Sequence, residues 1–342
     1  MFIENESINK RQEYLTYIKG VSFKIHLNKM VIRLEGKDTL DYLHRISTNS
    51  LKSLKPLNKA VTLFTNEKGR IIDRTHVLVY DNGCLLVGNG CEKNKLFSWI
   101  NRYIITEDIV STCASNDFSL IEVLGEQSTG FLSLLLGDKF LELNDNNYIT
   151  FEIAGEINYL FKDSYNGNRF SYLILSSSDS EIVINYLNEN KSFYETAIIP
   201  DVVYKSYRIE NGIPKQPFEI NDSINPHENG LISDVSFNKG CYIGQEVIAR
   251  LDTYDKVQRV LKGIVFEKVI NPELPAKILS INDEEIGIIT SIVYSEMFKK
   301  QIGLAIVRKK YLENDSEFYV ADGDDRIKLI ITDLPFNYEN IY

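Results

Sequence analysis

One cysteine, Cys241, lies in a sequence context that could make its thiol reactive. It follows Lys239 and Gly240 and precedes the segment GQEVIAR, which predicts the start of a helix. A thiol at a helix amino terminus beside a lysine experiences positive potential, which lowers the pKa of the thiol and favours the thiolate. We therefore predict Cys241 as a catalytic thiol, with Lys239 beside it. The residue type alone also allows a second interpretation, a small buried apolar side chain.

A second candidate site is the pair Arg208 and Glu210, near the end of a helix predicted over about 197–211. An ionised carboxylate only accepts hydrogen bonds, so Glu210 could hold a planar heterocycle with adjacent N–H donors, such as a pterin. Arg208 would accompany it in this binding site. The alternative is a solvated acid at the helix end that pairs with Arg208 or with a lysine.

Asp73 is a third candidate because it interrupts the apolar run GRIIDRTHV. An acid is unexpected on a buried strand face, so Asp73 could line a pocket as a catalytic base or polarising group. If that face is solvated, Asp73 is only the polar half of an alternating strand.

A local group of basic residues follows the cysteine segment and stands out in an acidic chain. Its members are Arg250, Lys256, Arg259 and Lys262. Such a group suits the carboxylates of a folate glutamate tail or an acidic partner. A solvated basic face is the alternative.

Two similar units are predicted to position these residues. Residues 29–48 predict a strand, a glycine turn and a helix, with Asp38 capping the first turn. Residues 118–137 repeat this order at an offset of about 89 residues. We interpret the repeat as two α+β units, although strand, glycine and helix are also a common connection.

The remaining segments complete a three-part organisation. Residues 60–89 predict an antiparallel meander, because β-rich runs are separated by N-E-K-G and D-N-G turns. From residue 256 onward, short apolar runs between glycine or charged turns predict a small barrel. We therefore expect a first unit over 1–117, completed by about 200–255, a second over 118–199, and a barrel module over 256–342.

Composition limits the classes of function. The chain has 342 residues and a formal net charge of −10, so general attraction to nucleic acid is not expected. It has no apolar run long enough to span a bilayer and no signal-peptide core, so we expect a cytoplasmic protein without a membrane partner.

The cysteines and histidines do not predict a metal site. The four cysteines are widely spaced, at Cys84, Cys91, Cys113 and Cys241, and the four histidines are scattered. Structural metal sites need several such ligands close together. We expect free thiols in a reducing compartment and no resident metal.

The octet KGCYIGQE at 239–246 resembles the signature of YgfZ-type proteins, which are relatives of the aminomethyltransferase, or T-protein, of the glycine cleavage system. The runs RIENGIP at 208–214 and NPHE at 225–228 resemble the segments that precede it in that family. Residues 34–49 and 64–73 resemble the first two segments of the superfamily. The resemblance therefore covers nearly the whole chain.

This resemblance implies a fold, a ligand and a role. The fold is two α+β units around a central folate-binding hole, followed by a carboxy-terminal β-barrel. The role is tetrahydrofolate binding in the synthesis or repair of iron–sulfur clusters, with iron–sulfur enzymes or cluster-assembly proteins as partners. Cys241 would be the functional thiol and Glu210 the pterin anchor, and Tyr242 and Gln245 of the octet join the folate-binding candidates. Arg250 and Arg259 would receive the folate tail.

Two alternatives to this role stay open. The first is a folate-dependent aminomethyltransferase or another one-carbon transferase. True aminomethyltransferases carry paired acids in the strand after the first turn, whereas this chain has Asp73 followed by Arg74. The second is a noncatalytic scaffold, because the sequence shows no complete acid–base constellation.

Overall fold

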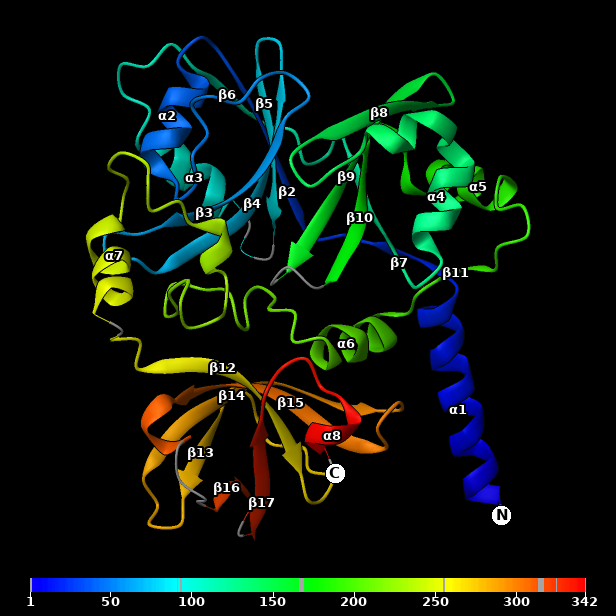
Figure 1. Ribbon diagram of the computed structural model, residues 1–342, viewed down its shortest axis with the longest axis vertical. Coiled ribbons are helices and arrows are strands. Elements are labelled where there is room, and N and C mark those ends of the chain that lie inside the picture. The colour runs from blue at the N-terminus through cyan, green and yellow to red at the C-terminus, as the bar shows by residue number, and fades with distance from the viewer. Residues whose placement is uncertain are drawn as a thin grey trace.

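The structure is a computed structural model that describes residues 2–90, 92, 94–165, 169–254, 256–312, 317–323 and 325–341. Two α+β units lie side by side, and a closed β-barrel lies below them in the view of Figure 1. The predicted fold class is therefore confirmed. Cys91 lies outside the described residues.

The first unit is built on a five-stranded antiparallel sheet. In sheet order its strands are β3 (Lys59–Thr65), β4 (Ile71–Tyr80), β5 (Gly83–Asn89), β2 (Lys29–Glu35) and β6 (Val110–Cys113). Helices α2 (Thr39–Ile46) and α3 (Lys95–Arg102) bury their apolar residues against one face of it. Asp38 does not cap α2 as predicted, because its carboxylate accepts a hydrogen bond from the backbone nitrogen of Asp108 at 2.8 Å instead.

The second unit is built on a six-stranded sheet. In sheet order its strands are β11 (Thr196–Ile198), β1 (Val21–Ile25), β7 (Ser119–Leu124), β10 (Arg169–Ser176), β9 (Glu156–Tyr165) and β8 (Tyr148–Ile153). Its helical segments are α4 (Ser128–Leu136), η1 (Gly137–Glu142) and α5 (Ser180–Glu189). Phe131 and Leu132 of α4 are buried here as Tyr42 and Leu43 of α2 are in the first unit, in agreement with the predicted repeat.

The predicted boundary after residue 117 falls between β6 and β7. Strand β1, however, pairs with β7 and β11, so the chain enters the second sheet before it builds the first. Helix α1 (Phe2–Lys19), which the sequence pattern did not predict, precedes β1 and runs down beside the barrel in Figure 1. Arg11 of α1 donates a hydrogen bond to the hydroxyl of Tyr338 at 2.8 Å, which links this helix to the end of the chain.

The barrel closes from six strands. In barrel order they are β12 (Arg259–Phe266), β15 (Lys300–Arg308), β14 (Glu285–Ser295), β13 (Ala276–Ser280), β16 (Phe318–Asp322) and β17 (Asp325–Thr332). The short segments η3 (Lys309–Tyr311) and α8 (Tyr338–Ile341) accompany them. The interior is filled by branched and aromatic side chains from all six strands. This module was predicted from its alternating apolar runs.

A long crossing segment joins the three bodies. It contains α6 (Asp201–Glu210), η2 (Ile232–Asp234) and α7 (Gln245–Thr253). Leu231, Tyr242 and Ile248 of this segment pack on Leu63 and Ile71 of the first unit. Helix α6 lies between the second unit and the barrel in Figure 1, and Ile209 packs with barrel residues.

The two sheets also pack on each other. Leu78 and Val87 of the first sheet share an apolar cluster with Leu120, Phe161 and Leu173 of the second. Strand β4 is therefore covered on both faces. Among the described residues, no helix combines the length and apolar character needed to cross a bilayer.

Candidate functional site in the central cavity

Four consecutive polar residues of β4, from Asp73 to His76, are buried. Asp73, Arg74 and His76 are 2%, 8% and 5% exposed. Their strand has helices on one face and the second sheet on the other, so neither face is solvated. The interpretation of Asp73 as the polar half of a half-exposed strand is therefore wrong.

The Asp73 carboxyl lies beside the end of β5. Its two oxygens are 3.2 and 3.3 Å from the backbone nitrogen of Asn89, which donates to them. Burial raises the pKa of Asp73 to about 8. The side chain is therefore mostly protonated at pH 7, so it can donate a hydrogen bond or a proton, as an ordinary surface aspartate cannot.

Arg74 occupies the position after Asp73 and is held by two carboxylates. Its Nε donates to Asp234 at 2.7 Å and its Nη1 to Asp163 at 2.8 Å, and its guanidinium carbon lies 4.2 Å from the centre of the Tyr165 ring. Burial alone would raise the pKa of Asp163, but the charge of Arg74 outweighs it and holds that pKa well below its ordinary value. The three charged groups join β4, β9 and the η2 segment.

His76 contacts the same carboxylate. Its Nε2 is 3.6 Å from Asp163 and its ring centre is 5.1 Å from that of Phe161. Burial lowers the pKa of His76, so its imidazole is neutral at pH 7. Its Nδ1 is buried and has no hydrogen-bond partner among the described residues.

A second polar cluster contributes to the cavity from the six-stranded sheet and α6. The Glu122 carboxylate is 2.9 Å from Nε2 of His26 and accepts a hydrogen bond from the Tyr204 hydroxyl at 2.8 Å. Burial alone would raise the pKa of Glu122, but the hydrogen bonds from His26, Ser171 and Tyr204 outweigh it and lower that pKa. Glu122 is thus an ionised, buried acceptor.

Except for Asp234 and Phe161, these side chains line one central cavity of about 140 Å³. An outer recess of about 350 Å³ adjoins it and shares His26, Tyr204 and Lys215 with it. Lys24 and Lys205 also line the recess. The cavity is therefore rich in acceptors, and its outer opening is basic.

The structure separates Arg208 from Glu210. Arg208 lines the cavity and the recess, and its guanidinium donates to Glu219 at 3.1 Å and to the Ser291 hydroxyl at 2.6 Å. Glu210 does not line the cavity. Its carboxylate accepts hydrogen bonds from Tyr14 of α1 and from Ser295 of the barrel, the latter at 2.6 Å. Glu210, predicted as the ligand anchor, therefore lies where α1, α6 and the barrel meet.

The octet lies outside the cavity and docks on the turn after β3. Gly244 has φ +84°, and a Cβ there would lie 2.5 Å from the backbone oxygen of Asn66, so only glycine fits. The ring of Tyr242 is buried in the cluster between the crossing segment and the first unit, and Gln245 is the first residue of α7. Neither residue lines the central cavity.

Lys239 fixes the loop before the cysteine. Its ammonium donates to the backbone oxygens of His44, Ser47 at 2.7 Å and Asn49 at 2.8 Å, at the end of α2. Burial lowers the pKa of Lys239 to about 8, so at pH 7 the ammonium still offers three donors to three acceptors. Cys241 itself is exposed, which excludes the buried apolar interpretation, and lies four residues before α7 rather than in its first turn.

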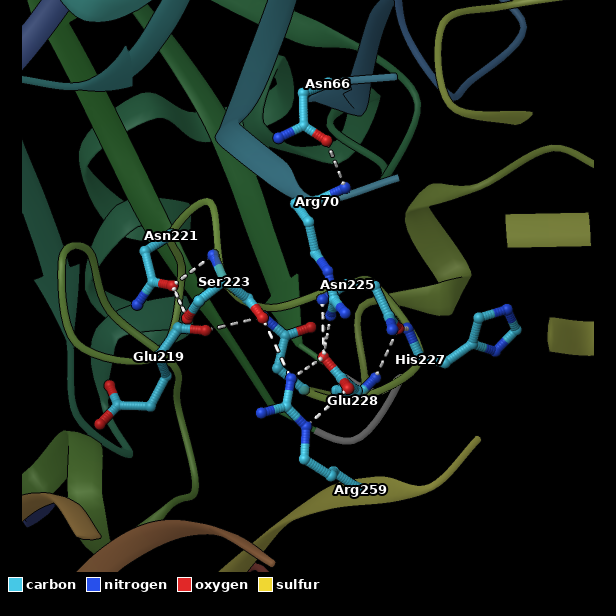
Figure 2. A network of polar contacts seen from close by, with 10 residues as sticks. Asn66, Arg70, Glu219, Asn221, Ser223, Asn225, His227, Glu228 and Arg259 are labelled. Carbon is cyan, nitrogen blue, oxygen red and sulfur yellow. Dashed lines mark hydrogen bonds and ion pairs between the residues drawn. The ribbon is translucent and has the colours of Figure 1, made fainter. Parts of the chain in front are cut away.

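The predicted basic group is also divided. Arg250 and Lys256 line a separate groove of about 360 Å³. Arg259 is instead engaged by Glu228, its Nε lying 2.9 Å from the carboxylate, and Arg70 of the first unit contacts the same carboxylate at 2.8 Å (Figure 2). Arg259 therefore serves to join the barrel to the first unit through Glu228.

The backbone of the crossing segment completes this junction. The carboxylate of Glu228 also accepts a hydrogen bond from the backbone nitrogen of Asn225 at 2.9 Å, and the side chain of Asn225 accepts from the backbone nitrogen of His227 at 3.0 Å (Figure 2). Lys262, the remaining member of the predicted group, pairs with Asp333 within the barrel module.

Several cavity residues escaped prediction from sequence. Glu122 lies in the run FSLIEVLG, where an acid interrupts apolar residues just as Asp73 does, and the same criterion would have found it. Asp163 of the cavity, and Asp234 that pairs with Arg74, do not interrupt a continuous apolar run and offer no such signal. Among the described residues, no group of three or more histidine, cysteine and acidic side chains is arranged to hold a metal ion.

Comparisons with known proteins agree with this architecture. The family profile described as "GCVT N-terminal domain" matches residues 24–239, and the "Glycine cleavage T-protein C-terminal barrel domain" matches residues 259–337. The crystal structure of the glycine cleavage system aminomethyltransferase T from Bartonella henselae superposes with a TM-score of 0.79 at 16% identity, over 97% of this chain and 90% of that one.

Curated relatives extend over most of the chain. An aminomethyltransferase of Staphylococcus carnosus is 24% identical over 96% of this chain and 89% of its own length. A chloroplastic protein of Arabidopsis thaliana, named as a transferase without a stated substrate, is 26% identical over 89% of this chain and 68% of its own length. By its two matched domains, this chain belongs to the aminomethyltransferase, or glycine cleavage T-protein, superfamily.

Proposed function

We propose that the chain binds tetrahydrofolate in the central cavity and takes part in a folate-dependent one-carbon transfer. The observation that carries this proposal is a buried acid, Asp73, whose pKa is raised to about 8 in a cavity enclosed by the units of an aminomethyltransferase fold. Its relatives named as aminomethyltransferases support the reaction class.

The residues present fit such a ligand. A pterin ring offers several N–H donors, and Glu122 is an ionised acceptor inside the cavity. The unpartnered Nδ1 of His76 is a further buried acceptor. Lys24, Lys205 and Lys215 at the outer recess suit the carboxylates of the glutamate tail. We assign the tail to this recess in place of the Arg250 and Arg259 positions, which lie elsewhere.

Bound tetrahydrofolate would supply the amine nitrogens that carry a one-carbon unit. In this site Glu122 would orient the pterin ring by accepting hydrogen bonds from the N–H groups of that ring. Asp73 would hold a proton close to the reacting nitrogen, since its pKa of about 8 keeps that proton available near neutral pH. Arg74 cannot act as a second acid, because both of its carboxylate partners hold it charged and fixed.

Calorimetric titration with tetrahydrofolate tests this assignment directly. Glu122→Gln should weaken binding by about 10- to 100-fold, in line with loss of a charge-assisted hydrogen bond of roughly 1.5–3 kcal/mol. Glu210→Gln is the matched control, a buried carboxylate outside the cavity, and should bind as the wild type does. Loss of binding in Glu210→Gln alone would restore Glu210 as the anchor. An absence of binding in the wild type would refute the folate proposal.

A second candidate function is maintenance of iron–sulfur clusters in cytoplasmic client proteins, with Cys241 as the thiol. The observation that favours it is the arrangement of the octet, in which Lys239, Tyr242 and Gly244 are fixed while Cys241 is exposed. A loop held this firmly presents one thiol to a partner or to a cluster as cargo.

The test compares two exposed thiols of the same chain. Cys241→Ser should abolish the recovery of a cluster-dependent client enzyme in a strain that lacks the protein, while Cys113→Ser should leave it intact. Both variants should fold and bind tetrahydrofolate normally. Full recovery with Cys241→Ser would exclude the thiol role and leave one-carbon transfer as the proposed function.

A further inference from the structure

The pairing of His26 with Glu122 gives the cavity a feature that Asp73 does not provide. His26 follows β1 directly and lines both the cavity and the outer recess. Its Nε2 lies 2.9 Å from the ionised Glu122 carboxylate, and a carboxylate can only accept. In the neutral form of the imidazole the proton is therefore on Nε2, and Nδ1 carries the free lone pair.

The surroundings of His26 leave that lone pair available. Among the described residues Nδ1 has no hydrogen-bond partner, and the side chain is 23% exposed. Tyr204 lies edge-on at 5.7 Å between ring centres and also donates to Glu122, which fixes the ring and the carboxylate together. A carboxylate that orients an imidazole is the arrangement of general acid–base pairs.

We propose that His26, oriented by Glu122, is a second acid–base group of this cavity. Nδ1 accepts a proton from a protonated amine of the bound ligand. The N–H bond of the amine breaks and its electron pair stays on that nitrogen, while the Nδ1 lone pair forms the new N–H bond. The imidazolium is balanced by Glu122 and returns the proton to water through the recess. This inference rests on the proposed function, since tetrahydrofolate supplies the amine.

The charged and titratable groups around His26 come from β1, β7, α6 and the loop after α6. From β7 it faces Glu122, and from α6 it faces Tyr204 and Asp201. Lys24 comes from β1, the strand before His26, and pairs with Asp201. Lys215 comes from the loop after α6, and its ammonium lies 5.8 Å from the Tyr204 ring. A third lysine, Lys205, lines the recess from α6. The recess next to His26 is therefore lined mainly by basic side chains, with Asp201 as its acid.

Nitrogen NMR of the imidazoles tests the inference without an activity assay. The chain has four histidines, so the signals can be assigned by substitution. In the free protein near neutral pH, the signals of the neutral His26 ring should show Nε2 protonated and Nδ1 unprotonated. Tetrahydrofolate should move Nδ1 to the protonated position. Glu122→Gln should abolish the tautomer preference in the free protein, whereas the control His44→Gln, on α2 outside the cavity, should leave every His26 signal unchanged.

The outcomes separate this inference from the proposed function. Tetrahydrofolate that binds the wild type without moving Nδ1 would overturn the role of His26 and leave the folate site standing. A free protein with the proton on Nδ1 would overturn it as well. If the wild type binds no tetrahydrofolate, the proposed function fails first, and the inference falls with its ligand. His26→Gln should still bind the ligand within a few-fold and lose about 10²–10⁴-fold in the rate of transfer.

Discussion

Asp73 should destabilise the folded protein at neutral pH. Its pKa is about 8 when folded, against an ordinary value of 3.8. At pH 7 the unfolded carboxyl is ionised and the folded one is not. The cost at pH 7 is set by the interval from the unfolded pKa of 3.8 up to pH 7, about 3 pH units at roughly 1.36 kcal/mol each, and amounts to ~4 kcal/mol. Asp73→Asn removes this cost, so we expect the free energy of unfolding at pH 7 to rise by about 2–4 kcal/mol.

The sign of the pH dependence provides the sharper test. A carboxyl whose folded pKa is raised contributes its full stability below pH 3.8 and loses it as pH rises toward 8. The advantage of Asp73→Asn should therefore be small near pH 4.5 and largest near pH 8. Because other groups titrate equally in both proteins, the difference between them isolates Asp73.

Urea unfolding followed by circular dichroism at pH 4.5, 6, 7 and 8 measures this difference. Asp117→Asn, at an exposed position, is the control and should change the free energy of unfolding by no more than about 0.5 kcal/mol at any pH. An Asp73→Asn protein that is less stable at pH 7, or whose advantage does not grow with pH, would refute the burial argument. An Asp73→Asn protein that is more stable but inactive would show that Asp73 lowers the stability of the fold and is needed for activity.

Three further substitutions probe the framework of the site. Arg74→Leu leaves Asp163 and Asp234 buried without their cation, so the free energy of unfolding, measured by heat or urea, should fall by about 3–5 kcal/mol. An unchanged free energy of unfolding would mean that the two carboxylates take up protons at little cost. Glu228→Gln removes the charge that joins the first unit to the barrel, and we expect a loss of about 1–3 kcal/mol together with faster protease cleavage between them, checked by limited proteolysis. Lys239→Met removes three hydrogen bonds to the end of α2, so hydrogen exchange in residues 44–49 and 238–243 should quicken, and unchanged exchange would argue against this anchoring role.

Sequence patterns predicted the architecture well because they depend on local periodicity. The meander, the repeated strand and helix, and the barrel all follow from apolar spacing and turn residues. Helix α1 was missed because its side chains show little segregation of apolar and polar residues. Strand β11 was missed because it has three residues, too few for a pattern to register.

The site was predicted only in part, and Arg208 and Glu210 show why. Two residues apart on α6, they lie on different sides of the helix, because side chains at i and i+2 do not face each other. Arg208 therefore reaches the cavity while Glu210 reaches the barrel. Their closeness in the sequence suggested a single binding site. In the helix they point in different directions, so they belong to two separate places in the fold.

The sequence alone determined which residues could carry chemistry, because an acid within an apolar run, as at Asp73, signals an unusual environment in any fold. Only the tertiary structure decided which of them meet. Arg74 and Asp234 are 160 positions apart, and His26 and Glu122 are 96 apart. The first pair meets because the crossing segment lies against β4, and the second because β1 pairs with β7 in one sheet. No local pattern in the chain encodes either arrangement.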